Sequence, residues 1–389
     1  MTDIAIASTA LNNEAAGEDL ATQIREKLNG AKPDALLVFA SPDNDYETLL
    51  KALDRGCSPR AMIGCSSAGE FTTQTSGTGL TSAIAIRSPD MKFNASLARR
   101  LANDRADAAA QLVNGFTGLA SAEFRYRTAI VLVDALAGHT EDLIEELTVA
   151  TGGMYQFVGG GAGDNADFKS THVFLGTDAH SNAAVALEIL SNKPIGIGAR
   201  HGWLPAGNPL RVTEADESRV VSLNVSPAAD AFEAHAATTS QDFDRANPMP
   251  FFLHNIVGVK SQDGHKLRVP LGVSADGGVS FAAEVPAGAT AQIMSTQVES
   301  ASAAAAEAVR DAVRQVEQSG NTASGALFFD CVATRLRLGD DFGDELDTVA
   351  RELKSVPFAG FNSYGQIVRA DGQFSGFHNC TAVVCVFPD

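Results

Sequence analysis

Basic residues are scarce in this chain. There are 29 Lys and Arg against 47 Asp and Glu, which gives a formal net charge of −18. Nucleic acids and anionic membranes are recognised by clustered cations, so we expect neither as a partner. Long apolar runs are also lacking, and none approaches the roughly 18 residues that a membrane-spanning helix needs. Residues 1–19 have no basic stretch followed by an apolar one, which predicts no signal peptide and a cytoplasmic protein.

Cysteine is sparse as well, with five residues in 389. An odd, scattered set in a long acidic chain predicts reduced thiols rather than disulfides. The sequence contains no CxxC, HExxH or HxH pattern, so the spacing typical of a metal centre is missing. It also contains no CxxCH pattern, which excludes covalent attachment of haem.

Two glycine-rich segments lack the residues that bind nucleotide phosphates. Residues 159–164 read GGGAGD, and no Lys follows the last glycine as a P-loop requires. Residues 196–201 read GIGARH and end in His where the dinucleotide fingerprint has glycine. Both segments lead into strand-like sequence instead of a helix. We therefore predict no phosphate loop at either segment.

What the sequence does contain is a repeated pattern. Residues 35–41 are an apolar strand signal, residues 45–56 a helix with leucines on one face, and residues 61–72 a strand that breaks at small residues. The same order returns at a constant offset of 94, which pairs Phe39 with Val133, Leu49 with Leu143, Leu53 with Leu147, Gly69 with Gly163 and Glu70 with Asp164. An offset shared by a strand, a helix and a bend indicates an internal duplication.

A third copy follows near the end of the sequence, with a strand at 325–331, a helix at 344–354 and a strand with the bend at 358–368. Before it lies a region of short, proline-punctuated strands and a helix. This order predicts an α/β fold of three strand-helix-strand-bend-strand units in layered mixed sheets, with an inserted β-rich region and helix. We assign two units to region 1–222, and the insert with the third unit to region 223–389.

The three bends share a pattern of small residues, then glycine, then an acid or amide. They read GCSSAGE, VGGGAGD and GFNSYGQ. One interpretation is steric, because glycine permits a close approach of backbones. A compatible interpretation is a pocket wall, where hydroxyl and amide groups bind a ligand and the acids meet a cation such as an ammonium group. The candidate ligand-binding residues are Ser66, Ser67, Glu70, Gly160, Asp164, Asn362 and Tyr364.

Cys65 and Ser66 in GCSSAG raise the question of a nucleophile. A catalytic Cys or Ser needs a base, and no His lies nearby in the sequence. The segment is also not the GxSxG elbow of hydrolases. A free Cys on a strand is usually a small buried residue. We therefore expect no enzyme, with a Cys65-dependent enzyme as the alternative and a pure interaction scaffold as a third class.

Three histidines lie beside apolar or aromatic residues. They are His378, His201 and His254, in the order in which we expect them to serve as an axial ligand of haem iron. Each is more typical of a hydrogen-bonded structural histidine than of a ligand. The two interpretations stay open at the level of the sequence.

These segments resemble a known family. GCSSAGEF, VGGGAGDN with the following GARHGW, and GFNSYGQI with the following FHNCTAVVCVF are similar to the hallmark segments of FIST domain proteins. The similarity covers nearly the whole chain, with a FIST N part over about 30–220 and a FIST C part over about 225–370. Family members often carry a Cys followed closely by an Arg-Gly pair. Here the segment is DCVATRLRLG, so Arg335 is shifted and has no Gly beside it.

The resemblance implies a bacterial, cytoplasmic sensory protein of signal transduction that binds a small ligand. It implies a partner such as a histidine kinase of a two-component system or a cyclic-dinucleotide signalling protein, because the sequence shows no kinase-like segment of its own. One branch of the family consists of haem proteins that sense nitric oxide, and membership would imply haem b as cofactor. Without haem, the resemblance implies a sensor of an amino-acid-like ligand and no cofactor.

Overall fold

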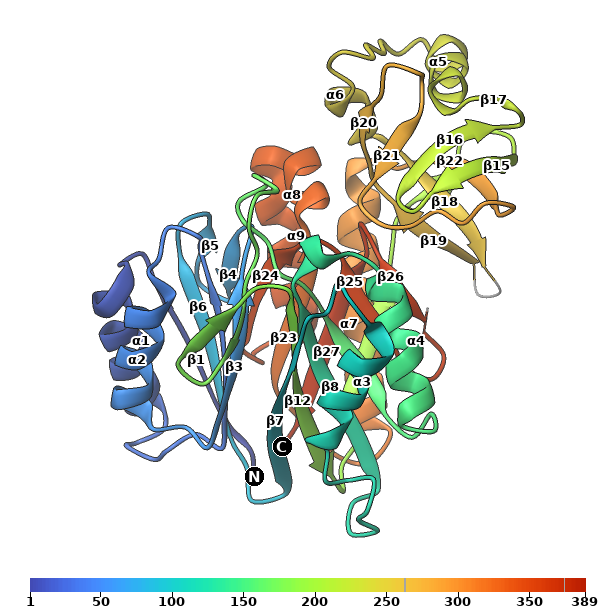
Figure 1. The fold of residues 1–389 in the computed structure, drawn as a ribbon. Helices are drawn as coiled ribbons and strands as arrows, with labels where there is room; N and C mark the ends of the chain where they lie inside the picture. The colour runs from blue at the N-terminus through green and yellow to red at the C-terminus, as the bar shows by residue number, and fades with distance from the viewer. Residues whose placement is uncertain (262–263, 374) are drawn as a thin grey trace.

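The computed structural model describes residues 1–261, 264–373 and 375–389, and it confirms the predicted mixed α/β fold (Figure 1). Within these ranges the main body has three mixed sheets of six strands each. The first contains, in order, β1 (Asp3–Thr9), β6 (Thr81–Arg87), β2 (Ala35–Ala40), β3 (Ala61–Ser66), β10 (Val173–Leu175) and β11 (Asp178–His180). The second contains β26 (Gly376–His378), β25 (Gln366–Arg369), β9 (Gln156–Gly161), β8 (Tyr126–Val133), β12 (Ala183–Ser191) and β7 (Met91–Arg99). The third contains β13 (Gly196–Arg200), β27 (Ala382–Pro388), β23 (Ala323–Cys331), β24 (Phe358–Ser363), β4 (Glu70–Thr72) and β5 (Ser76–Gly77).

Each sheet carries helices on its outer face (Figure 1). The helices are amphipathic and bury their apolar positions against the sheet, as the leucine spacing in the sequence predicts. The first sheet is covered by α1 (Asn13–Lys27) and α2 (Tyr46–Cys57), and the second by α3 (Arg105–Asn114) and α4 (Thr140–Ala150). The third is covered by α7 (Val298–Glu317) and α9 (Phe342–Leu353).

The third repeat is longer than its sequence signal. The edge strand β13 and the helix α7 occupy the places that β1 and α1 hold in the first sheet and β7 and α3 in the second. The strand β13 lies before the inserted region and α7 lies after it. The insertion therefore interrupts the third repeat between its first strand and its first helix.

Each repeat sends a two-stranded hairpin, β4–β5, β10–β11 or β25–β26, to a neighbouring sheet. After its bend, the first repeat continues into β4, which pairs with β24 of the third repeat. The second repeat sends β10 to β3 of the first, and the third repeat sends β25 to β9 of the second. The exchange is cyclic, so none of the three sheets is made by one repeat alone.

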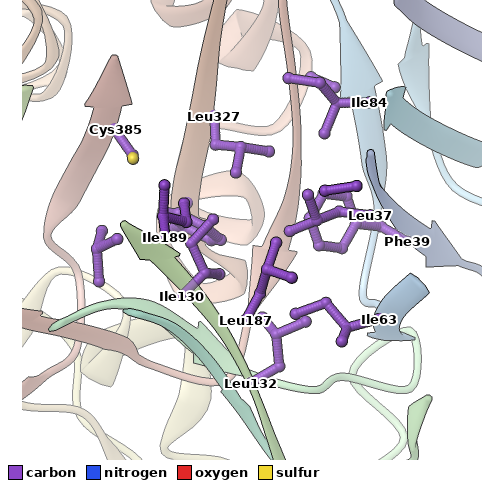
Figure 2. Packing of buried hydrophobic residues seen from close by; sticks show 14 of the residues in the cluster. Leu37, Phe39, Ile63, Ile84, Ile130, Leu132, Leu187, Ile189, Leu327 and Cys385 are labelled. Carbon is purple, nitrogen blue, oxygen red and sulfur yellow. The ribbon is translucent and has the colours of Figure 1, made fainter. Parts of the chain in front are cut away.

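The inner faces of the three sheets share one apolar core, shown in Figure 2. Leu37 and Phe39 come from the first sheet, Leu132 from the second and Leu327 from the third. The ring of Phe39 stacks on that of Phe361 from the third sheet, with 4.5 Å between centroids. Burial of such surfaces contributes about 25 cal/mol per Å², so this shared core joins the repeats energetically.

The constant offset of 94 is correct for the helices and wrong for the strands. In the parallel pairs, Ala40 lies opposite Ser66 and Val133 lies opposite Gly161. The inward-facing Phe39 therefore corresponds to Leu132, one residue short of that offset, and Ser66 corresponds to Gly161, one residue beyond it. Loops absorb such one-residue differences without disturbing the packed elements.

The insertion forms a separate sheet with its own core, at one end of the molecule (Figure 1). The strand order of this sheet and the residues of its core are given for the described residues only. Its elements are β14 (Leu204–Pro205), β15 (Leu210–Asp216), β16 (Arg219–Leu223), β17 (Ser226–Pro227), α5 (Ala228–Thr239), α6 (Met249–Phe252), β18 (Asn255–Ser261), β19 (Gly264–Arg268), β20 (Pro270–Val273), β21 (Val279–Phe281) and β22 (Thr290–Ser295). We call this part the inserted module.

Candidate functional site

The three bends meet at one end of the main body, where the parallel pairs β2–β3, β8–β9 and β23–β24 reach their carboxyl ends. We call this place the pole. Ligands of open α/β sheets bind outside the carboxyl ends of the strands, so this is the expected location of a site. The bends are joined by backbone hydrogen bonds from Gly163 to Ser66 (2.9 Å), from Ala68 to Asn362 (3.0 Å) and from Gly161 to Gly365 (2.8 Å).

The glycine run is required by close backbone approach. Gly159 has φ +154°, and a Cβ added there would lie 1.9 Å from the carbonyl oxygen of Val131 on the neighbouring strand. A Cβ at Gly163 would lie 2.8 Å from the Cβ of Ala68 in the first bend. The steric interpretation of the sequence therefore has direct geometric support at both positions.

Asp164 closes the loop that follows the second bend. Its carboxylate accepts hydrogen bonds from the backbone N–H groups of Phe168 (2.9 Å), Lys169 (2.6 Å) and Ser170 (2.8 Å). It also accepts one from the hydroxyl of Tyr364 in the third bend. The hydrogen bonds from the protein occupy most of the lone pairs of the Asp164 carboxylate. Asp164 therefore stabilises the structure of the pole, and few of its lone pairs are left for a cationic ligand.

Glu70 and the two serines of the first bend are buried together. The hydroxyl of Ser67 donates to Glu70, and the backbone N–H of Leu80 donates to the other carboxylate oxygen at 3.0 Å. Ser66 accepts from the backbone N–H of His172 at 2.9 Å. Burial raises the pKa of Glu70 to about 7, while the hydrogen bonds and Arg335 oppose that rise. Glu70 is therefore a carboxyl group that can exchange a proton near neutral pH.

Two donors at the pole have no hydrogen-bond partner among the described residues: the buried Nε of Arg335 and the buried Nδ2 of Asn362. Both side chains lie over Gly69, where an added Cβ would be 2.6 Å from Asn362 Oδ1 and 3.2 Å from Arg335 Nε. Arg335 also interacts electrostatically with Glu70 and Tyr364. Buried donors without acceptors are costly, at about 1–3 kcal/mol each, so this pair calls for an acceptor.

Apolar side chains surround the pole on its solvent side. The ring of Phe168 stacks on that of Tyr364 with 4.5 Å between centroids, and Phe168 is 44% exposed. Leu136 in the 3₁₀ helix η1 (Ala135–Ala137) and Leu336 in the helix α8 (Val332–Leu338) are exposed to a similar degree. Each of these residues comes from a connection that leaves the end of a sheet. We call these three residues the apolar rim.

The structure thus brings together the seven predicted ligand-binding residues at the pole. Gly160 pairs with Gln366 across β9 and β25 and is fully inside the body. Ser66, Ser67, Glu70, Asp164 and Asn362 are each less than 5% exposed. The pole is tightly packed as it stands, because an added Cβ at Gly69 or Gly163 would meet neighbouring atoms at less than 3 Å.

None of the three predicted haem ligands belongs to the bends, but His378 pairs across β26 and β25 with Gln366 of the third bend. His378 is 1% exposed on β26, and burial together with Arg268, Lys266 and His201 lowers its pKa. His201 accepts a hydrogen bond from the backbone N–H of Trp203 at 3.3 Å, and His254 is exposed on the inserted module. A porphyrin needs apolar walls on both faces. Haem binding stays a prediction from the family.

Cys65 has no activated thiol. It is fully buried on β3, and burial, followed by the charge of Glu70, raises its pKa well above the ordinary value. All five cysteines are free and buried. Among the described residues no three His, Cys, Asp or Glu side chains form a group suited to a metal ion.

Sequence reasoning missed several charged residues of the third repeat. Arg335 departs from the spacing of the family pattern, yet it reaches the pole. Asp330, Arg337 and Glu345 carried no motif. Their signal is positional, because Asp330 ends an apolar strand and Glu345 stands on the apolar face of a helix. Only a three-way alignment of the repeats makes that signal visible.

The fold and the pole define a three-repeat α/β protein with interlocked bends and a buried, charged centre at the carboxyl ends of its strands. The family follows from sequence comparison. The FIST N domain matches residues 34–226 and the FIST C domain matches residues 228–369, so the chain belongs to the FIST family. FIST domains are sensory domains that bind small ligands in signalling proteins, which fits a non-enzymatic role.

Comparisons with other proteins add little. No curated protein matches this chain. Among solved structures, cyanuric acid hydrolase from A. caulinodans is 8% identical with a TM-score of 0.32, covering 100% of this chain and 99% of that one. T. maritima PurL complexed with ATP is 13% identical with a TM-score of 0.24, covering 100% of this chain and 71% of that one. Such scores carry no argument about this protein.

In the part of the chain that the structure describes, no helix combines the length and apolar character required to cross a membrane.

Proposed function

We propose that this protein is a cytoplasmic sensor that binds a small polar ligand at the pole and regulates a partner signalling protein. The partner would be a histidine kinase or a cyclic-dinucleotide signalling protein, as for FIST domains in general. The family supports the sensory class, and the geometry of the pole supports the location. The single observation that supports the location is the pair of buried donors, Arg335 Nε and Asn362 Nδ2, without an acceptor.

The chemistry around the two donors favours an amino-acid-like ligand. A guanidinium and an amide donor suit a carboxylate, which accepts several hydrogen bonds at once. Glu70 follows Gly69 in the first bend and interacts electrostatically with Arg335, and in its ionised form it suits an ammonium group. A zwitterion would satisfy both partners and would hold Glu70 ionised at neutral pH. This ligand class is preferred over a phosphate, which would be repelled by Glu70.

The helix α8 provides a route for the signal. It carries Arg335 on the side of the pole and exposes Leu336, a member of the apolar rim, to solvent. Because the pole is packed, a ligand can enter only if α8 or the loop around Phe168 moves. Such a movement would rearrange the apolar rim, which is the surface that a partner protein would contact.

The proposal is tested by thermal unfolding of the wild-type protein with L-amino acids, short carboxylates and amines as separate probes. We expect at least one zwitterionic probe to raise the midpoint in a saturable way. The Arg335→Ala variant should lose that response. The Arg314→Ala variant, which removes an exposed arginine of α7, should respond like the wild type. A response that survives in Arg335→Ala would overturn the location of the site.

Haem-based sensing of nitric oxide requires a different test. The absorption spectrum of protein produced with ample haem decides it. A stoichiometric Soret band that shifts with nitric oxide would replace our proposal, and His378→Ala, His201→Ala and His254→Ala variants would then identify the ligand. A colourless protein that ignores added haemin is the result our proposal expects.

A further inference from the structure

A second charged site lies in the third repeat, where the chain connects to the inserted module. A narrow cavity of about 10 Å³, enough for one water-sized group, is lined by residues of the third repeat and of the two chain connections. Trp203 and Thr296 flank the two chain connections to the inserted module, and both line the cavity. The lining also includes two acids and a base: Asp330 at the end of β23, Glu345 on α9 and Arg337 on α8.

The other two repeats show what this place normally contains. In the parallel strand pair of the third repeat, Asp330 lies opposite Asn362. The corresponding pairs are Ala40 with Ser66 in the first repeat and Val133 with Gly161 in the second. Asp330 therefore occupies the position of Ala40 and Val133. Those two residues are fully buried members of the apolar clusters between sheet and helices.

The same replacement occurs on the helix. Three buried positions of α2, α4 and α9 share the same spacing, and Glu345 falls where α2 has Leu49 and α4 has Leu143. Each leucine belongs to the same apolar cluster as its partner on the strand. The third repeat has therefore exchanged an apolar contact between strand and helix for two carboxylic acids.

The two acids lack partners that would explain the exchange. Asp330 and Glu345 are each 1% exposed. Within the described ranges, both carboxylate oxygens of Asp330 lack a hydrogen-bond partner. The same is true of Oε2 of Glu345 and of Nε of Arg337. Buried charges are costly unless they are paired. Burial raises the pKa of Glu345, and burial together with the charge of Glu345 raises the pKa of Asp330, which expresses that cost.

The charges around the cavity sum to one negative charge when both acids are ionised. Arg337 supplies one positive charge and rests over the ring of Trp203 at 5.6 Å. Arg200 also lines the cavity, but it forms an ion pair with Asp311. One further positive charge of water size would neutralise the site and occupy its volume.

We propose that this cavity, which we call the joint cavity, binds a water-sized monocation between Asp330 and Glu345. An alkali ion, ammonium or the head group of a small amine shares this chemistry. A divalent metal is less suited, because Arg337 already compensates one charge, and the described residues offer no group of three ligating side chains. The bound cation would connect α9 and β23 at the place where the inserted module joins the body.

The experiment measures the unfolding midpoint of the full chain at pH 8 in choline chloride, a cation too large for the cavity. Choline is then replaced stepwise by potassium, sodium, ammonium or methylammonium chloride at constant ionic strength. We expect a saturable rise of about 2 °C at tenfold excess over the dissociation constant for a water-sized cation. A rise with alkali ions identifies an inorganic cation, and a larger rise with methylammonium identifies an amine head group.

Two variants test whether the two acids hold the cation. The Asp330→Val/Glu345→Leu double variant copies the second repeat, so it should fold and lose the response. The Asp344→Asn variant removes an exposed acid of the same helix and should respond like the wild type. A wild-type midpoint that ignores the cation, as expected for a water molecule or a proton shared by the two acids, would overturn the proposal. So would a double variant that still responds.

Discussion

At the residue scale, the glycines of the segment 158–164 are explained by distances between backbones. The backbone of the neighbouring strand β8 lies close to the Cα of Gly159, and Gly163 packs against Ala68 of the first repeat. These contacts are possible because neither residue has a Cβ. The sequence suggested this function for the glycines, since a repeated bend with small residues is typical of close approach.

The first prediction concerns Gly159→Ala. The new Cβ would lie 1.9 Å from a carbonyl oxygen, and φ +154° is strained for alanine. We expect the free energy of unfolding to fall by more than about 3 kcal/mol. Gly272→Ala on β20 is the control, because nothing lies within 4 Å of its added Cβ. Equal stability of the two variants in urea unfolding would show that the approach is not as close as described.

The second prediction concerns Asp164→Ala. The substitution leaves three backbone N–H groups and the hydroxyl of Tyr364 without their acceptor. We expect a loss of about 2–4 kcal/mol in the free energy of unfolding. Asp167→Ala removes an exposed acid of the same loop and should change it by less than about 0.5 kcal/mol. If both variants behave alike in denaturant unfolding, Asp164 does not order the pole.

The third prediction uses the pKa of Glu70, which burial raises from 4.5 to about 7. Between these values the folded state keeps a proton that the unfolded state has lost, so stability falls as pH rises through this window. Glu70→Gln lacks this dependence. Relative to wild type, its free energy of unfolding should rise by up to about 3 kcal/mol from pH 4.5 to pH 7. A pH-independent difference between the two proteins would mean that Glu70 titrates normally.

At the scale of elements, α8 distinguishes the third repeat from the others. Residues two positions apart on a helix point in nearly opposite directions, so Arg335 faces the pole and Arg337 faces the joint cavity. In the second repeat the corresponding connection contains only the short helix η1. The seven-residue helix α8 thus lies between the two charged sites. A movement of α8 at one site would therefore displace its side chain at the other site.

Secondary structure was largely predictable at this scale because the elements have strong apolar periodicity. The leucines of α2 and α4 face inward at the predicted spacing. The functions of Arg335 and Glu345 were not predictable from one repeat. A charged residue on an apolar face or beside a shifted motif gives no local sign of what it contacts, because its neighbours come from other repeats.

At the scale of the whole molecule, the sequence predicted three units but not how they join. The strands β4, β10 and β25 each leave their own repeat for the next sheet. Which sheet a strand joins after a bend depends on pairing between residues far apart in the chain, and local periodicity does not record such pairing. The same reason hid β13 and α7, which an insertion separates from the rest of the third repeat.

The strand exchange leads to the fourth prediction. Because each sheet contains a strand from another repeat and all three share one core, the repeats should unfold together. Native-state hydrogen exchange should give one free energy of opening for β3, β9 and β24. The inserted module has its own core and should open with a lower free energy. Distinct free energies for the three strands would contradict an interlocked body.

The central claim is that a small polar ligand binds at the pole. Hydrogen exchange of the wild-type protein, with and without the amino-acid probe that raises its unfolding midpoint most, tests this claim most directly. We predict that added protection concentrates in α8 and in the three bends, at residues 66–70, 160–164 and 362–366. Protection confined to the inserted module or to the outer helices α1 and α3 would contradict the account.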